Sequence, residues 1–150
     1  MKSGANLIVE DGGEIYIKNS LKATSAQIDV ASGGVVQVND YFKSSSDILN
    51  ISGDFIVKGD CKITSSVVNV DGLITFKGDL TSSSCTWNNP NINFESKLQQ
   101  TVSGSAINVN NLTVNNSSKS GITFNSTVNY YGAYDKGNSV ITGETYIVEK

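Results

Sequence analysis

The side chains that could do chemistry in this chain are carboxylates and lysines, because its 150 residues include no histidine and no arginine. Histidine is the usual general base near neutral pH, and arginine grips anions through paired hydrogen bonds. A serine nucleophile would lack its usual base, and an ordinary zinc site would lack histidine or closely spaced cysteine ligands. We therefore expect no enzyme, with no catalytic residue, no cofactor and no bound metal.

A pair of aspartates is the nearest approach to a metal site. Asp60 and Asp79 stand nineteen residues apart, and each follows a lysine by two residues (Lys58 and Lys77). If copies of the sequence stack, the two carboxylates form a ladder that offers oxygen ligands to Ca²⁺. The adjacent lysines favour a plainer interpretation, a solvated turn in which lysine neutralises aspartate.

Three lysines form a second ladder. Lys22, Lys43 and Lys62 recur at one position in successive copies of the sequence. Like charges on neighbouring rungs repel, so these side chains should fan out into solvent, where they protect a sheet or attract an acidic polymer weakly. They are candidate surface-binding residues for an anionic glycan.

Tyrosines gather near the C-terminus, at Tyr130, Tyr131, Tyr134 and Tyr146. A tyrosine ring can stack on a sugar, and it can equally cover the end of a stack of strands. Tyr130, Tyr131 and Tyr134 are the second set of candidate surface-binding residues.

These ladders arise because the chain repeats itself. The repeat is marked by glycines (Gly13, Gly34, Gly53 and Gly72), spaced 21, 19 and 19 residues apart. Apolar residues recur at four offsets from each glycine: Ile15, Val36, Phe55 and Ile74 at +2; Ile17, Val38, Val57 and Phe76 at +4; Leu21, Phe42, Cys61 and Leu80 at +8; and Ile28, Leu49, Val68 and Trp87 at +15.

Alternation of apolar and polar residues within each copy predicts short strands with one buried face. Polar corner residues separate the strands, including a Ser/Thr band (Thr24-Ser25, Ser45-Ser46, Thr64-Ser65 and Ser83-Ser84) whose hydroxyls could bond between copies. A period near twenty with this patterning is typical of stacked coils. The predicted fold class is all-β, a single parallel β-helix or β-solenoid domain over residues 1–150 with coils of about 19 residues.

The expected coils differ in regularity. Regular coils span 7–89, less regular ones span 90–131, and 132–150 is unassigned. Leu7 and Val9 match Ile28 and Val30, so residues 1–12 look like the tail of an earlier coil. This partial coil favours a fragment of a longer protein over a complete one.

Two weaker copies follow residue 89. With Pro90 in the glycine column, Ile92, Phe94 and Leu98 fall at +2, +4 and +8. A second, looser copy starts at Gly121 and contains Ile122, Phe124 and Val128, and two short alternating runs (107–109 and 112–114) lie between the copies.

Cys61 and Cys85 occupy different columns in different copies, so free thiols that pack as small apolar residues are expected. The formal net charge of −3 and the scattered lysines argue against nucleic-acid binding. No segment approaches the roughly twenty apolar residues that a membrane span needs, which argues against membrane insertion.

Residues 94–132 resemble β-solenoid stretches of large bacterial surface proteins: haemagglutinin-like adhesins, autotransporter passengers and polymorphic-toxin stalks. The matching segments are QTVSG (100–104), NLTVNNS (111–117) and GITFN (121–125), followed by Val128. The resemblance implies a right-handed parallel β-helix at the cell surface or outside the cell, and it implies no catalytic residue. Residues 1–13 lack the apolar core of a signal peptide, so a cytoplasmic location is the alternative.

Three functions compete. The first is a non-catalytic rod segment of an exported adhesin or toxin-delivery protein, with flanking coils, further copies, or a cell-surface glycan or protein as partners. The second is a cytoplasmic, bactofilin-like cytoskeletal polymer, echoed in SGDFIVKGD (52–60) and DGLITFKGD (71–79). The third is a pectate-lyase-like enzyme. This function is less favoured, because coils of 19 residues leave no long loops to form a substrate groove.

Overall fold

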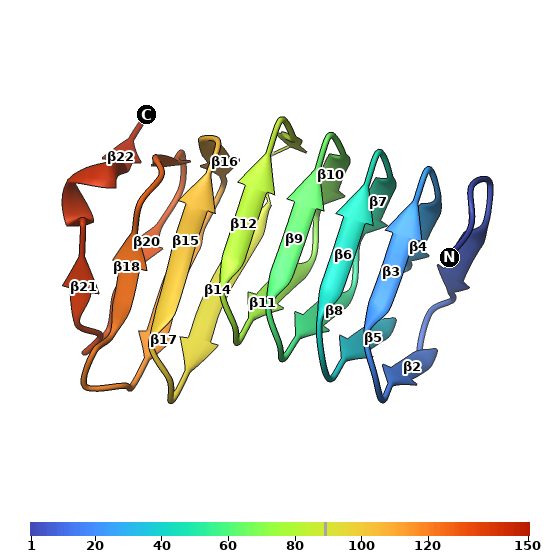
Figure 1. Ribbon diagram of the computed structural model, residues 1–150, viewed down its shortest axis with the longest axis horizontal. Coiled ribbons are helices and arrows are strands. Elements are labelled where there is room, and N and C mark those ends of the chain that lie inside the picture. Colours follow the sequence, from blue (N-terminus) through green and yellow to red (C-terminus); the bar gives the residue numbers. More distant parts are fainter. Residues whose placement is uncertain (89) are drawn as a thin grey trace.

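A computed structural model describes residues 1–88 and 90–150, which wind into about seven turns of roughly 20 residues each (Figure 1). Strands make up 56% of the chain and helix 2%, so the predicted all-β solenoid is confirmed. Every strand pair is parallel, as stacked coils require.

Each full coil contributes one strand to each of three faces, which we name in chain order. Face 1 consists of β2 (Glu14–Ile17), β5 (Val35–Val38), β8 (Asp54–Val57), β11 (Leu73–Phe76), β14 (Asn91–Ser96), β17 (Leu112–Asn116) and β20 (Tyr134–Asp135). Face 2 consists of β3 (Leu21–Thr24), β6 (Phe42–Ser45), β9 (Cys61–Thr64), β12 (Leu80–Ser83), β15 (Gln100–Gly104), β18 (Ile122–Phe124) and β21 (Ile141–Thr142).

Face 3 consists of two sheets that lie end to end. The first contains β1 (Asn6–Val9), β4 (Gln27–Val30), β7 (Ile48–Ile51), β10 (Val67–Val70) and β13 (Thr86–Asn88). The second contains β16 (Ile107–Val109), β19 (Val128–Tyr130) and β22 (Ile147–Glu149). Strands β13 and β16 are in contact, and a short 3₁₀ helix (Glu144–Tyr146) precedes β22.

The register of the pairing confirms the columns read from the sequence. On face 1, Ile15 pairs with Val36, Val36 with Phe55, and Phe55 with Ile74. Residues of one column therefore stack at the parallel-strand spacing of about 4.8 Å. Because alternate residues point to opposite sides of a strand, one set from each face fills a narrow interior.

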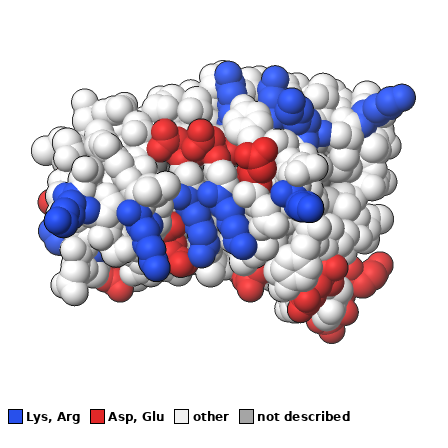
Figure 2. Space-filling view, turned by 60° about the horizontal axis from the view of Figure 1, so that its bottom comes forward, with Lys and Arg blue, Asp and Glu red and all other residues white. Residues whose placement is uncertain are grey.

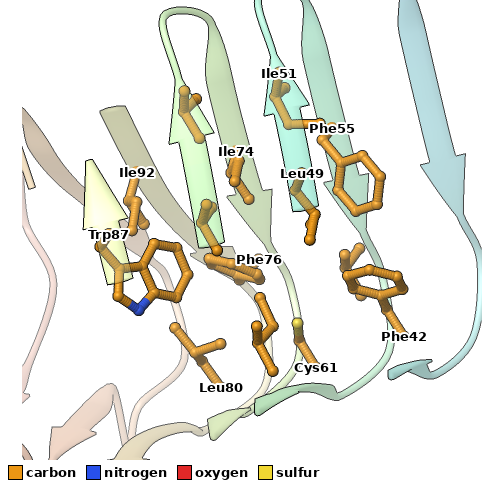
Figure 3. Packing of buried hydrophobic residues seen from close by; sticks show 14 of the residues in the cluster. Phe42, Leu49, Ile51, Phe55, Cys61, Ile74, Phe76, Leu80, Trp87 and Ile92 are labelled. Carbon is orange, nitrogen blue, oxygen red and sulfur yellow. The ribbon is translucent and has the colours of Figure 1, made fainter. Parts of the chain in front are cut away.

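Several aromatic rings lie in this interior (Figure 3). The ring centroids of Phe42 and Phe55 lie 5.1 Å apart, and those of Phe76 and Phe94 lie 5.7 Å apart. Trp87 is also buried, and its indole N–H donates to Ser82 Oγ at 3.0 Å. Phe42, Phe55, Phe76 and Trp87 all belong to the apolar columns predicted from the sequence, and all four are buried.

The first strand belongs to an incomplete coil. Strand β1 pairs with β4, with Leu7 opposite Ile28 and Val9 opposite Val30. The interpretation of residues 1–12 as the tail of a preceding coil is therefore confirmed in its register.

One predicted core position, Leu98, is wrong: its side chain is 76% exposed. Val102 takes its place and pairs with Leu80 on face 2. The spacing misled because the fifth coil is four residues longer here: seven residues (95–101) separate Phe94 from Val102, whereas three (77–79) separate their partners Phe76 and Leu80. The added residues lengthen the strands, since β14 continues to Ser96 and β15 begins at Gln100.

The expected start of a copy at Gly121 is also wrong. Ile122 pairs with Gln100 and Phe124 with Val102, so both lie on face 2. The face 1 strand of this coil is β17, whose Leu112 pairs with Ile92. The segment 132–150, unassigned from the sequence, supplies β20, β21 and β22 of a further coil.

The corner between faces 2 and 3 turns on a left-handed residue. Ser25, Ser46, Ser65 and Ser84 have φ between 49° and 59°. Backbone hydrogen bonds help to stack this corner, for example from the Ser25 N–H to the Ser45 carbonyl at 3.0 Å. The Ser/Thr band therefore marks a tight corner.

A buried carboxylate braces the same corner. Asp47 is 1% exposed, and its carboxylate accepts from the Ala26 N–H at 2.8 Å, the Ser44 hydroxyl at 2.7 Å and the Ser45 N–H at 3.0 Å. Ser66 Oγ accepts from the Asp47 N–H at 3.1 Å, which links the next coil. The carboxylate and the backbone N–H of Asp47 together thus connect three successive coils.

Replacing this carboxylate should cost stability. We expect Asp47→Ala to lower the free energy of unfolding by about 3 kcal/mol, because three donors lose their acceptor at a buried corner. Urea unfolding followed by circular dichroism measures the loss. Asp47→Asn, which keeps one acceptor oxygen, should lose less, and Asp29→Ala on the outer surface should lose under about 1 kcal/mol. Equal losses at Asp47 and Asp29 would contradict the bracing role.

Candidate functional site

The lysine ladder lies on the outer surface of face 2. Lys22 pairs with Lys43 and Lys43 with Lys62, and all three side chains are exposed. In the next two strands of face 2 the same position holds Thr81 and Ser103, which are uncharged. The positive charge is therefore limited to three successive strands. The structure therefore brings together the three lysines predicted as a surface-binding set, on an open sheet surface.

An acidic row runs beside this ladder, along the corner between faces 1 and 2. Figure 2, which turns this corner toward the viewer, shows acidic side chains in a row with lysines on both sides. Asp60, between β8 and β9, and Asp79, between β11 and β12, lie at this corner and contact backbone. The Asp79 N–H donates to Asp60 Oδ1 at 3.0 Å, and the Thr101 N–H donates to Asp79 Oδ1 at 2.7 Å. Each of these two carboxylates therefore caps the coil that follows it.

The calcium alternative for Asp60 and Asp79 gains no support from this geometry. Among residues 1–88 and 90–150, no group of three or more His, Cys, Asp or Glu side chains is placed to hold a metal ion. The lysines nearest in sequence lie toward face 1, where Lys77 Nζ pairs with Glu95 Oε1 at 3.0 Å and Lys58 is exposed.

The C-terminal tyrosines do not share one surface. Tyr130 and Tyr134 contact each other, with ring centroids 5.6 Å apart, and both pack against the core. Burial, with a smaller contribution from the Glu144 charge, raises the pKa of Tyr134 to about 12. Tyr131 is 53% exposed. Two of the three predicted residues are therefore partly buried against the last coils, and Tyr131 is the most exposed of the three.

Sequence reasoning missed an amide ladder on the outside of face 3. The Asn50 side-chain amide donates to Asp29 at 2.7 Å, and the amide of Asn69 donates to Asn50 at 2.8 Å. Asn88 extends the ladder by donating to Asn69 at 2.5 Å. The 19-residue spacing of the three asparagines is the sequence pattern that could have indicated this ladder. These amides satisfy one another, so the ladder is structural.

Both cysteines are free, as predicted. Cys61 is buried in the core, and burial raises the pKa of its thiol well above the ordinary value. Cys85 is half-buried, and its Sγ lies 3.3 Å from the Ser83 carbonyl oxygen. A thiol held neutral in this way is a poor nucleophile, which suits a packing role for Cys61.

No protein-family model, curated protein or solved structure gives a significant match to this chain. In the described part of the chain, no helix is long and apolar enough to cross a bilayer.

Proposed function

We propose that this chain is a non-catalytic rod segment of an exported bacterial surface protein, an adhesin or a toxin-delivery protein, that holds or presents other molecules. The observation that carries the proposal is the continuity of the stack. Faces 1 and 2 each run through seven strands, and their first and last strands have one unpaired edge. A stack of this kind acts through its length and its lateral surface.

The open ends expose part of the core. Ile15 and Ile17 at one end, and Ile141 and Ile147 at the other, are only partly buried. An unpaired strand edge with apolar side chains beside it is a template for another strand. The favoured partners are therefore flanking coils or further copies of the chain, added end to end.

The lateral surface supports a binding role of low affinity per contact. Charged and polar side chains recur along the rod, as the exposed Lys22, Lys43 and Lys62 illustrate. Repeated weak contacts gain strength when many copies act together. A cell-surface glycan or protein is the class of partner that such a surface fits. The lack of histidine and the structural use of Asp47, Asp60 and Asp79 support a role without catalysis.

The open ends also favour the second candidate, a cytoplasmic polymer of the bactofilin type. In that case the purified chain should form filaments in electron micrographs as its concentration rises. A rod segment that needs flanking coils should instead give short, irregular oligomers.

Multivalent display tests the proposal. Beads coated densely with the chain should be retained on surfaces that carry an acidic polysaccharide, such as polygalacturonate or dextran sulfate, while the free chain should dissociate quickly. Beads that pass every coated surface would contradict the binding role. Shortening of the polysaccharide during the assay would show catalysis and would contradict the non-catalytic proposal.

A further inference from the structure

We propose that a trough along the corner between faces 1 and 2, lined by Lys58, Lys77, Lys97, Leu98, Asn115 and Ser117, binds an acidic polysaccharide. This inference rests on the proposed binding role and assigns it a place and a ligand class. The trough differs from the lysine ladder of face 2, whose side chains stand on an open sheet surface.

The trough consists of two adjoining hollows. The first, of about 400 Å³, contains the six residues named above. The second, of about 310 Å³, shares Asn115 and Ser117 with the first and continues past Asn138 and Ser139. Together they run from the third coil to the last, which is roughly 20 Å along the axis at the parallel-strand spacing.

One wall of the trough exists because the fifth coil is longer at this corner. The segment between Phe94 and Val102 (95–101, named the projection) has seven residues where the preceding coil has three, and its residues 97–99 are exposed. Leu98 lies on this projection, and its backbone is fixed on both sides: its N–H donates to Ser96 Oγ at 3.1 Å, and its carbonyl accepts from the Asn116 amide at 2.9 Å. Its exposed apolar side chain therefore extends from a fixed backbone position.

A buried amide pair supports this wall from inside. Gln100 is 1% exposed, and its side-chain amide donates to the Phe76 carbonyl at 3.0 Å and to the Gly78 carbonyl at 2.9 Å. Its oxygen accepts from the Asn116 amide at 2.9 Å. Because Gln100 ties the projection to the preceding coil, the trough is formed before a ligand arrives, which lowers the entropic cost of binding.

The chemistry of the lining matches a charged sugar polymer. Within the lining, three lysines face one glutamate, Glu95, which leaves two positive charges in excess. The neighbouring carboxylates of Asp60 and Asp79 lie outside the lining and accept from backbone N–H groups. Amide and hydroxyl groups of Asn115 and Ser117 can bond sugar hydroxyls, and the fixed Leu98 offers an apolar contact for a ring face. The lining includes no aromatic side chain on which a nucleic-acid base could stack.

Paired lysine variants test the location. We expect Lys58→Ala with Lys97→Ala to weaken binding of fluorescein-labelled dextran sulfate and polygalacturonate roughly tenfold in an anisotropy titration, and to lower the salt dependence by about two released ions. Lys2→Ala with Lys150→Ala removes the same charge from two exposed positions outside both the trough and the lysine ladder, and should change affinity by less than about twofold. Leu98→Ser should weaken binding without altering the salt dependence. Thermal melting checks that all variants fold.

The outcomes separate this inference from the proposed function. If both double lysine variants weakened polysaccharide binding equally, binding would depend on overall charge and the trough would not be the binding site. The bead assay would still support a rod that binds polysaccharide. Equal affinity for neutral dextran, or tighter binding of polyglutamate or single-stranded DNA than of either acidic glycan, would overturn the ligand class. Failure of beads coated with the unaltered chain would count against the rod proposal itself.

Discussion

Val57→Asp should abolish soluble folded protein. The Val57 side chain is fully buried in mid-stack and pairs with Val38 and Phe76 of the adjacent coils. A carboxylate there has no partner and no water, and the cost should exceed about 4 kcal/mol, a large part of the total stability of an ordinary domain. Circular dichroism and size-exclusion chromatography measure the outcome.

The matched control is the neighbouring residue on the same strand. Ile56 points outward and is only partly buried, so Ile56→Asp should fold with a modestly lowered unfolding midpoint. Similar melting curves for the two variants would mean that the inward and outward columns of β8 are reversed.

Gly72→Ala should cost at least about 3 kcal/mol. A Cβ at this position would overlap the carbonyl oxygen of Gly53 and lie 2.7 Å from the carbonyl carbon of Ser52, both in the coil beneath. Backbone cannot rotate away as a side chain can, so two coils would have to separate along their hydrogen bonds. Urea unfolding of the purified variant gives the magnitude.

Gly13, in the same column of the first coil, provides the comparison. Its added Cβ would lie 3.0 Å from the Glu10 carbonyl oxygen and 3.2 Å from a Val9 methyl, near the open end. Gly13→Ala should therefore cost about 1 kcal/mol. An equal cost at Gly13 and Gly72 would show that close stacking between coils is not what requires glycine.

Residue spacing was enough to predict the fold wherever the coils keep the same length. The columns through Val36, Phe55 and Ile74 needed only the glycine spacing and the two-residue alternation of strands. Leu98 was misplaced because an apolar residue at the expected offset cannot be told from a core residue by spacing alone. Gln100 anchors the chain at this corner. Its side chain is buried, but a polar residue type gives no indication of burial in the sequence.

The candidate site was predictable only in part. The lysine ladder follows from the repeat, since Lys22, Lys43 and Lys62 share a column. The trough depends on a difference between coils, because Lys97 and Leu98 belong to a segment (95–101) that is four residues longer than its counterpart in the preceding coil. A repeat pattern shows what the coils share and not how they differ. The buried hydrogen-bond network around Asp47 was not predicted for the same reason.

The uniform register of the middle coils also bears on how such a chain can change over evolutionary time. Residues 53–71 form one complete unit between two equivalent glycines, and each residue of Gly53–Val57 has its counterpart in Gly72–Phe76. An in-frame loss of this segment would set Ile74 over Val36 and Phe76 over Val38, with every face still aligned. An in-frame duplication would lengthen the stack by the same step. The gene can thus alter the reach of the rod in whole units without redesigning its interior.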